Sequence, residues 1–203
     1  MKDYDMYSRL MAEDDGYGDC SFPDNGSETL VIHPEDHSTL FLSAIYENKG
    51  WDVMTDPFVN DDTVTELIKS HSRIICLGHG NPDGLFCADR LIINASHVPL
   101  LKKKELICIW CHASDFLKKN NLQSIFYTHM FISEKIESEL YDIPTDDLTI
   151  DLSNDLFATT LSKYIDSDNI IERVKREYNA PDDTIVSFNR NRLYSNLQEV
   201  INA

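Results

Sequence analysis

Two short segments hold the residues of this chain that could perform chemistry together. Leu77-Gly78-His79-Gly80 ends one apolar run, and Trp110-Cys111-His112-Ala113-Ser114 ends another. A thiol beside an imidazole can act as a nucleophile with its base. The folded chain must bring His79 and Cys111 to one place for this chemistry, so the elements that precede them decide whether it is possible.

The runs before both segments are predicted β-strands. Residues 73–77 and 105–110 are short and rich in β-branched or bulky apolar side chains, as buried strands are. In a parallel α/β sheet the carboxyl ends of adjacent strands open into one crevice, which is the usual place for a ligand. We therefore expect His79 and Cys111 to meet in one cleft.

An alternation of predicted strands and helices runs from residue 29 to residue 140. It predicts an α/β fold, a three-layer sandwich with a mainly parallel central sheet and helices on both faces. The predicted strands are 29–33, 51–55, 73–77, 105–110 and 124–128, with a hairpin of 85–87 and 91–93, and the predicted helices are 38–49, one from 60, 95–103, 114–119 and 133–140.

The ends of the chain differ from this central part. Residues 1–28 are polar and acidic and predict a flexible arm,. Residues 29–203 predict a single domain with its core in 29–140 and a mainly helical C-terminal part in 141–203. Within that part we expect helices at 154–165, 170–178 and 193–201 and a strand at 184–188.

Composition excludes several classes of partner. The net charge of −17 over 203 residues repels nucleic-acid phosphates and anionic lipids, so we expect binding to neither. No apolar stretch is long enough to span a bilayer. The amino terminus lacks the pattern of a signal peptide, and the five cysteines are an odd number that favours a reducing compartment. We expect a cytoplasmic protein.

Cys111 is the candidate nucleophile. It precedes a predicted helix, and the amides of a helix amino terminus favour a thiolate. The alternative is that Cys111 is a buried strand thiol like Cys76 and Cys108, which lie inside apolar runs,. Its place at the strand end, before polar side chains, favours the nucleophile.

His79 is the candidate base, and it lies between Gly78 and Gly80. These glycines allow a ligand to approach the backbone closely. The amides of Gly80 and Cys111 could then stabilise a developing oxyanion. The alternative is a loop histidine held by Asp83 or by a backbone carbonyl.

Three other patterns involve the same segment. Cys108-Ile109-Trp110-Cys111-His112 matches the haem c attachment sequence, although that chemistry requires export. Cys108 and Cys111 could also form a thioredoxin-type redox pair. Three of His79, Cys111, His112 and His129 could converge on zinc, but their spacing does not demand it,. We expect no metal and no cofactor.

A strand ending in His-Gly, a hairpin, a helix and a strand ending in Cys resemble the caspase-like cysteine peptidases, which include caspases, metacaspases, gingipains, separases and CHAT domains. The residues that carry the resemblance are 74–80 and 106–111, and it spans roughly residues 29–140. It implies a hydrolase with a His79–Cys111 dyad that cuts a protein or peptide substrate, with Gly80 and Cys111 amides as oxyanion hole.

The chain departs from this family at Trp110, where most members carry a small residue. No residue of a specificity pocket is evident, although Asp115 is a candidate that would favour Arg or Lys before the cut. These departures leave open a degenerate pseudo-peptidase, a non-catalytic interaction module on the same fold. The sequence does not determine the oligomeric state.

Overall fold

A computed structural model of the chain describes residues 27–196. The arm predicted at residues 1–28 lies outside this range except for Ser27 and Glu28. Within the range, no helix combines the length and apolar character needed to cross a membrane.

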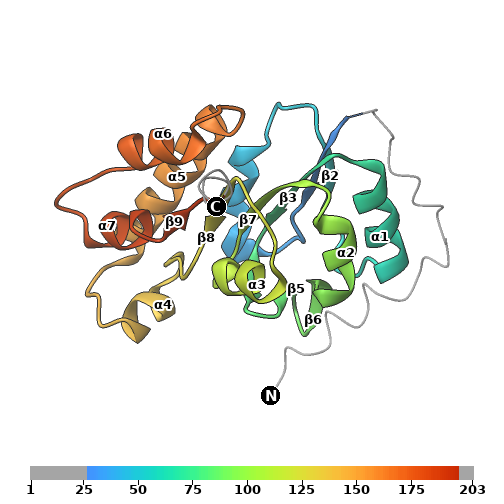
Figure 1. Cartoon of the computed structure of the whole chain (residues 1–203). Helices are drawn as coiled ribbons and strands as arrows, with labels where there is room; N and C mark the ends of the chain where they lie inside the picture. The colour runs from blue at the N-terminus through green and yellow to red at the C-terminus, as the bar shows by residue number, and fades with distance from the viewer. Residues whose placement is uncertain (1–26, 197–203) are drawn as a thin grey trace, which may run out of the picture.

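A six-stranded sheet lies at the centre of the molecule (Figure 1). Its strand order is β2-β1-β3-β7-β8-β9, with all neighbours parallel except β9, which is antiparallel to β8. This arrangement confirms the α/β class and the mainly parallel central sheet. The strands are β1 (Thr29–Ile32), β2 (Asp52–Met54), β3 (Arg73–Leu77), β7 (Glu105–Ile109), β8 (Phe126–Thr128) and β9 (Leu193–Tyr194).

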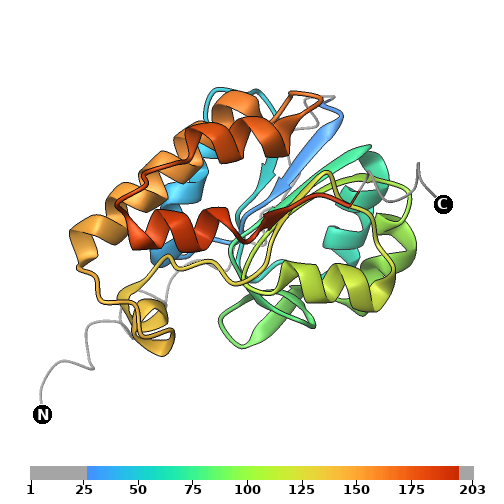
Figure 2. The ribbon, with the colours of Figure 1, turned by 60° about the vertical axis from the view of Figure 1, so that its left-hand side comes forward.

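Helices pack on both faces of this sheet, an arrangement compatible with a three-layer sandwich (Figures 1 and 2). Alternate strand residues serve the two faces, as the pleat requires: Ile74 and Cys76 pack on one side, Ile75 and Leu77 on the other. The first face is covered by α1 (Asp61–Ser70), α2 (Val98–Leu101) and α3 (Ala113–Asn120), and the second by the 3-10 helix η1 (His37–Ile45), α5 (Asp147–Tyr164), α6 (Ile170–Glu177) and α7 (Thr184–Arg190).

A small antiparallel sheet follows β3 directly and carries the candidate base. It has the order β4-β5-β6, and β4 begins at His79. The hairpin predicted after the Asn81–Gly84 turn is therefore present. The sheet also contains β4, a strand that was not predicted because glycines flank His79. The bounds are β4 (His79–Asn81), β5 (Gly84–Cys87) and β6 (Arg90–Ile93), with the short helices η2 (Ala95–His97) before α2 and α4 (Lys135–Leu140) after β8.

Two predictions for the C-terminal part are wrong. Residues 184–188 form helix α7 and not a strand, because the Asp183 carboxylate accepts hydrogen bonds from the amides of Ile185 and Val186 and so starts a helix,. The helix predicted at 193–201 begins instead as strand β9, which pairs with β8; its residues 197–201 lie outside the described range. A cap by Asp146 also starts α5 earlier than the predicted 154.

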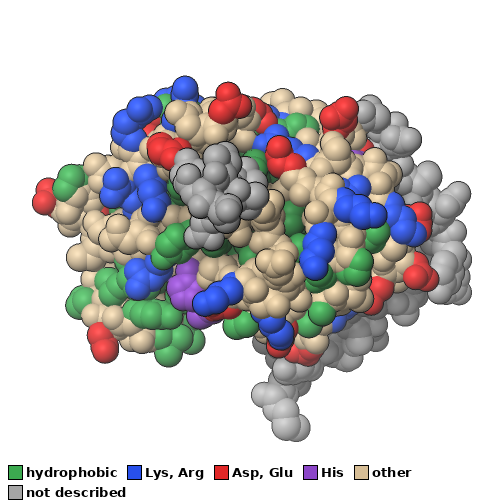
Figure 3. Space-filling model, in the orientation of Figure 1, with side chains coloured by type: hydrophobic (Ala, Val, Ile, Leu, Met, Phe, Trp, Pro, Cys, Tyr) green, Lys and Arg blue, Asp and Glu red, His purple; other side chains and the backbone are tan. Residues whose placement is uncertain are grey.

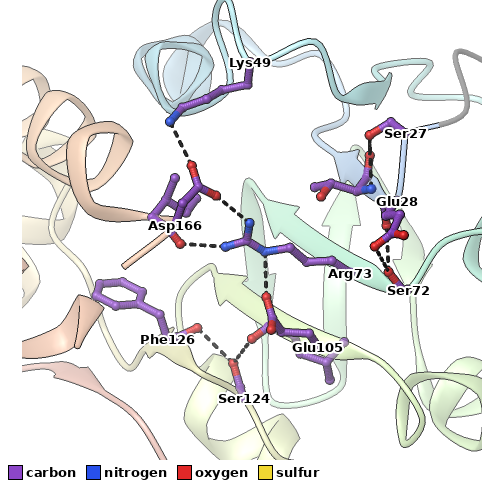
Figure 4. A network of polar contacts seen from close by, with 12 residues as sticks. Ser27, Glu28, Lys49, Ser72, Arg73, Glu105, Ser124, Phe126 and Asp166 are labelled. Atoms are coloured by element: carbon purple, nitrogen blue, oxygen red, sulfur yellow. Dashed lines mark hydrogen bonds and ion pairs between the residues drawn. The ribbon is translucent and has the colours of Figure 1, made fainter. Parts of the chain in front are cut away.

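An ionic network joins the amino end of β3 to the end of α5 (Figure 4). The guanidinium of Arg73 contacts Asp166 at 2.7 Å, Glu105 at 2.8 Å and the carbonyl of Ile165 at 2.6 Å. Lys49 reaches the other oxygen of Asp166 at 3.1 Å. Charge-assisted bonds of this kind are stronger than neutral ones, and here they lie at the opposite end of β3 from His79.

Candidate functional site

The ends of β3 and β7 bring His79 and Cys111 to one pocket. Leu77 is paired with Ile109 in the parallel register, and each candidate residue follows two positions after its strand's last residue. The Gly78 amide donates to the Ile109 carbonyl at 3.1 Å, which continues the strand contact toward the site. Both His79 and Cys111 line a small pocket of about 20 Å³.

His79 is held by a serine and an aspartate from the start of η1. Its Nε2 lies 2.6 Å from the Ser38 hydroxyl, and that hydroxyl lies 2.7 Å from Asp36 Oδ1. The imidazole also stacks on Phe86 of β5, with ring centroids 6.2 Å apart. The ring is therefore fixed on one edge and on one face.

Proton counting assigns the tautomer of His79. The bond from the Ser38 hydroxyl lowers the pKa of Asp36. An ionised carboxylate only accepts, so Ser38 donates to Asp36 and must accept from His79 Nε2–H. Nδ1 is then the ring nitrogen left to accept a proton.

Cys111 is partly buried and lies against two acceptors. Its Sγ is 3.4 Å from the Phe131 carbonyl and 3.5 Å from Glu137 Oε1. Burial first, and then the charge of Glu137, raises the pKa of the thiol to about 12. The thiol is therefore protonated in this conformation, contrary to the thiolate expected from the helix amino terminus.

Gly80 and Trp110 are in close contact beside the pocket. A methyl group added at Gly80 would lie 1.9 Å from Cδ1 of Trp110, so only glycine fits there. The Trp110 indole N–H donates to the Asn81 carbonyl at 3.3 Å. The bulky residue before Cys111 is thus accommodated by the absence of a side chain at Gly80.

A larger acidic cleft of about 680 Å³ adjoins the small pocket and shares Phe41 and Ser133 with it. Its lining carries more acidic than basic side chains. These charged residues are Glu134, Lys135, Asp147, Asp151 and Asp155.

Asp115 lies in the first turn of α3 and contacts His112 and His129. It is not among the residues that line either of the two cavities, so the structure gives no support to Asp115 as a substrate-pocket residue. Of the four residues considered for zinc, His112 and His129 come together, while His79 and Cys111 lie at the small pocket.

Cys108 does not resemble a redox cysteine. It is only 3 % exposed in the core, and burial raises the pKa of its thiol well above the usual value. A reactive dithiol needs a partly exposed cysteine whose thiol ionises near neutral pH. Nothing in this environment favours the Cys108–Cys111 redox pair.

Three residues of this site were not found from the sequence: Asp36, Ser38 and Glu137. Asp36-His37-Ser38 begins four positions after the last residue of β1. An Asp two positions before a Ser is a common helix-start pattern, so these residue types indicate a helix cap and not a contact with His79. Glu137 lies on α4, far along the chain, and only the fold brings it to Cys111.

This chain matches no family model, no curated protein and no solved structure.

Proposed function

We propose that this chain is a cysteine endopeptidase with Cys111 as nucleophile and His79 as base. The observation that carries the proposal is the shared pocket of the two side chains at the carboxyl ends of β3 and β7. The position at parallel strand ends is where α/β sheets usually bind ligands. The Ser38 and Asp36 contacts further support it, because they hold the ring of His79 with Nδ1 free to accept a proton.

In the proposed reaction, His79 takes the proton of the thiol while the Cys111 sulfur attacks the carbonyl carbon of the scissile bond. The proton then passes to the leaving amine as the peptide C–N bond breaks and a thioester forms. Water attacks the thioester, its oxygen goes to the acyl carbon, and one proton returns to the sulfur. The products are a carboxylic acid and an amine.

The amides of Gly80 and Cys111 are the proposed oxyanion donors. Asn81 pairs with Gly84 across a two-residue turn, and Gly80 is opposite Leu85. In such a hairpin the pair next to the turn is hydrogen-bonded and the following pair is not. We therefore expect the Gly80 N–H to face away from β5, available to a substrate oxygen.

The conformation described here corresponds to a resting state of the proposed enzyme. A pocket of about 20 Å³ has room for roughly one water molecule, and burial, together with the charge of Glu137, keeps the thiol protonated. Catalysis therefore requires Glu137 to move away from Cys111. Glu137 lies on the short helix α4, so a small shift of this helix would open the pocket and remove the charge together.

The proposed substrate is a peptide with a basic residue in the acidic cleft. The cleft shares lining residues with the pocket of Cys111, and Asp147, Asp151 and Asp155 lie along it on one helix. A lysine or arginine side chain near the scissile bond complements these charges. The overall charge of −17 favours the approach of such peptides,.

The test is cleavage of a fluorogenic peptide library that varies the residue before the cut. We expect turnover of Arg and Lys peptides, its loss in Cys111→Ala, and its retention in Cys87→Ala, which removes another buried thiol. Asp151→Asn should weaken the preference for basic peptides. Absence of turnover by the wild-type chain over the whole library, with Glu137→Ala equally inactive, would exclude the proposal.

The alternative is a non-catalytic interaction module with the same fold. It is favoured by the protonated Cys111 thiol and by exposed apolar side chains on α4, where Ile136 is 65 % and Leu140 75 % exposed. A stable partner whose binding is unaffected by Cys111→Ala, together with a chain that cleaves nothing, would establish this alternative.

A further inference from the structure

Three metal-ligating side chains meet on the surface beside α3, outside the pocket of Cys111. They are His112, Asp115 and His129. Asp115 Oδ2 lies 3.0 Å from His112 Nδ1 and 3.6 Å from His129 Nδ1, so one carboxylate oxygen lies between two imidazole nitrogens. All three candidate ligand atoms lie within 4.8 Å of one another.

The backbone holds the two histidines in fixed relation. His112 follows β7 and His129 follows β8, which are neighbouring parallel strands. The His112 N–H donates to the His129 carbonyl at 3.1 Å. His112 also has the left-handed backbone angle φ 66°, which is uncommon outside glycine,. The cluster is therefore built on the sheet and not on a loose loop.

The distances are close to those of a bound metal. Around a tetrahedral zinc ion with bonds of roughly 2.0–2.1 Å, neighbouring ligand atoms lie ~3.3 Å apart. The distances from Asp115 Oδ2 to His112 Nδ1 and His129 Nδ1, 3.0 and 3.6 Å, lie on either side of this value. The distance between the ligand nitrogens of the two histidines is at most 4.8 Å, and it shortens if the two imidazole rings turn toward each other.

We propose that His112, Asp115 and His129 form a binding site for a divalent transition metal, with zinc as the best match. Two imidazoles and one carboxylate suit zinc, and three protein ligands leave a fourth position for water or another molecule. The site is open to solvent, since the three side chains are 33 %, 45 % and 36 % exposed. Figure 3 shows histidine side chains at the surface on the face that carries α3 and α4.

The Ser114 hydroxyl lies at the edge of this site. It is 2.7 Å from His129 Nδ1, the nitrogen that the ion would take. If the hydroxyl donates to that nitrogen, the nitrogen carries the lone pair that a metal needs, and rotation about χ1 of Ser114 frees it. The serine then becomes an outer partner of the site and not a competitor.

A simple helix cap explains only part of this cluster. His112 and Asp115 are three residues apart at the start of α3, where a carboxylate is stabilised by the exposed amides. That role does not require His129, which comes from another strand and approaches the same oxygen. A shared metal accounts for all three.

The test is titration of the metal-free full-length chain with Zn²⁺ by calorimetry, and with Co²⁺ by visible absorption. We expect one ion per chain and a Co²⁺ spectrum without thiolate charge transfer. His112→Ala, Asp115→Asn and His129→Ala should each weaken binding at least about tenfold. The exposed His37→Ala and the neighbouring Cys111→Ala should retain the wild-type affinity.

Asp115→Asn keeps the size of the side chain and guards against misfolding as the cause, and each variant is checked by its thermal unfolding without metal. Absence of binding to the wild-type chain overturns the proposal. So does binding that survives in all three ligand variants, or a thiolate band in the Co²⁺ spectrum. None of these outcomes depends on peptidase activity, so failure here is distinct from failure of the proposed function.

Discussion

At the scale of single residues, the charge of Glu137 adds to the burial that raises the pKa of the Cys111 thiol. Its Oε1 contacts the Cys111 sulfur, while Oε2 accepts from the Ser133 and Glu134 amides at 2.7 and 3.1 Å. These two amide hydrogen bonds hold the Glu137 carboxylate beside the Cys111 thiol. The same residue thus caps the start of α4 and adds its charge to the burial that keeps Cys111 protonated.

We expect Glu137→Gln to speed alkylation of Cys111 by iodoacetamide at pH 8 by about threefold to tenfold. The substitution removes the negative charge that opposes the thiolate, and one unit of pKa is tenfold in thiolate concentration below the pKa. Mass spectrometry assigns the modified cysteine. Glu139→Gln, on the exposed side of the same helix, is the matched control, and an equal rate in both variants would contradict the role given to Glu137.

His33 links stability to pH. It is 3 % exposed, and its ring nitrogens contact Tyr46 at 3.0 Å and Thr39 at 3.3 Å. Burial lowers its pKa from 6.5 to about 4. In the unfolded chain the His33 imidazole therefore becomes protonated as pH falls below about 6.5, whereas in the folded chain it stays neutral until pH falls toward 4.

From this difference we expect the folded chain to lose stability as pH falls from about 6.5 to about 4, with a contribution from His33 of ~3 kcal/mol at most. Above pH 7 the contribution is constant because the ring is neutral in both states. Urea unfolding of the wild type and of His33→Gln at several pH values measures it. The variant should show a flatter dependence, whereas the exposed His37→Gln should follow the wild type.

At the scale of elements, the site depends on how β4 packs against the residue before Cys111. Gly80 leaves the space that the Trp110 ring fills, and Trp110 also packs against Phe116 of α3 with centroids 5.7 Å apart. The small antiparallel sheet and the central sheet are thus fitted together at the candidate site.

We expect Gly80→Ala to cost about 1–3 kcal/mol of stability, because the new methyl group forces the Trp110 ring out of place. The same displacement should abolish turnover. Gly50→Ala is the contrast: an alanine is strained at the backbone angle φ +68° of this position, but nothing lies within 4 Å of the added carbon,. It should lower stability and leave turnover intact, and equal loss of turnover in both variants would contradict the packing argument.

The pattern of apolar and polar residues predicted the strands that precede His79 and Cys111. It failed where a helix cap or pairing with another strand decides the structure. The predicted strand 73–77 has the bounds of β3, because a short run of β-branched and bulky apolar residues favours a buried strand. Residues 184–188 are rich in β-branched and apolar side chains, yet the Asp183 cap starts a helix there. β4 contains Gly80 and Asn81 and follows Gly78, and these residue types do not predict a strand. The segment is a strand because it pairs with β5.

The contacts of the site could not be predicted, because they join segments far apart in sequence. Ser38 reaches His79 from the first helix, and Glu137 reaches Cys111 from beyond β8. Their residue types are common in turns and helix starts. Only the order of strands in the sheet tells which of them meet.

At the scale of the whole molecule, the Arg73 network fastens the C-terminal helices to the sheet. Arg73 lies on β3, and Asp166 follows the end of α5, so the network connects the two halves of the chain. Arg73 is only 14 % exposed on its side chain. Removal of its charge leaves Asp166 and the Ile165 carbonyl without their main partner.

We therefore expect Arg73→Met to lower the free energy of unfolding by ~1–3 kcal/mol. Lys69→Met breaks an exposed pair with Glu66 and should change it by less than ~0.5 kcal/mol,. Urea unfolding of both variants measures the difference. Equal, small effects would show that the network contributes no more than a surface ion pair.

The central claim, that His79 and Cys111 form one reactive pair, is tested most directly by covalent labelling with a peptidyl acyloxymethyl ketone that carries arginine next to the warhead. Mass spectrometry of the wild type is expected to place a single adduct on Cys111. The rate should fall at least about hundredfold in His79→Ala while remaining unchanged in Cys87→Ala. A wild-type Cys111 that stays unlabelled even in the Glu137→Gln background, or labelling that proceeds equally without His79, would contradict the account.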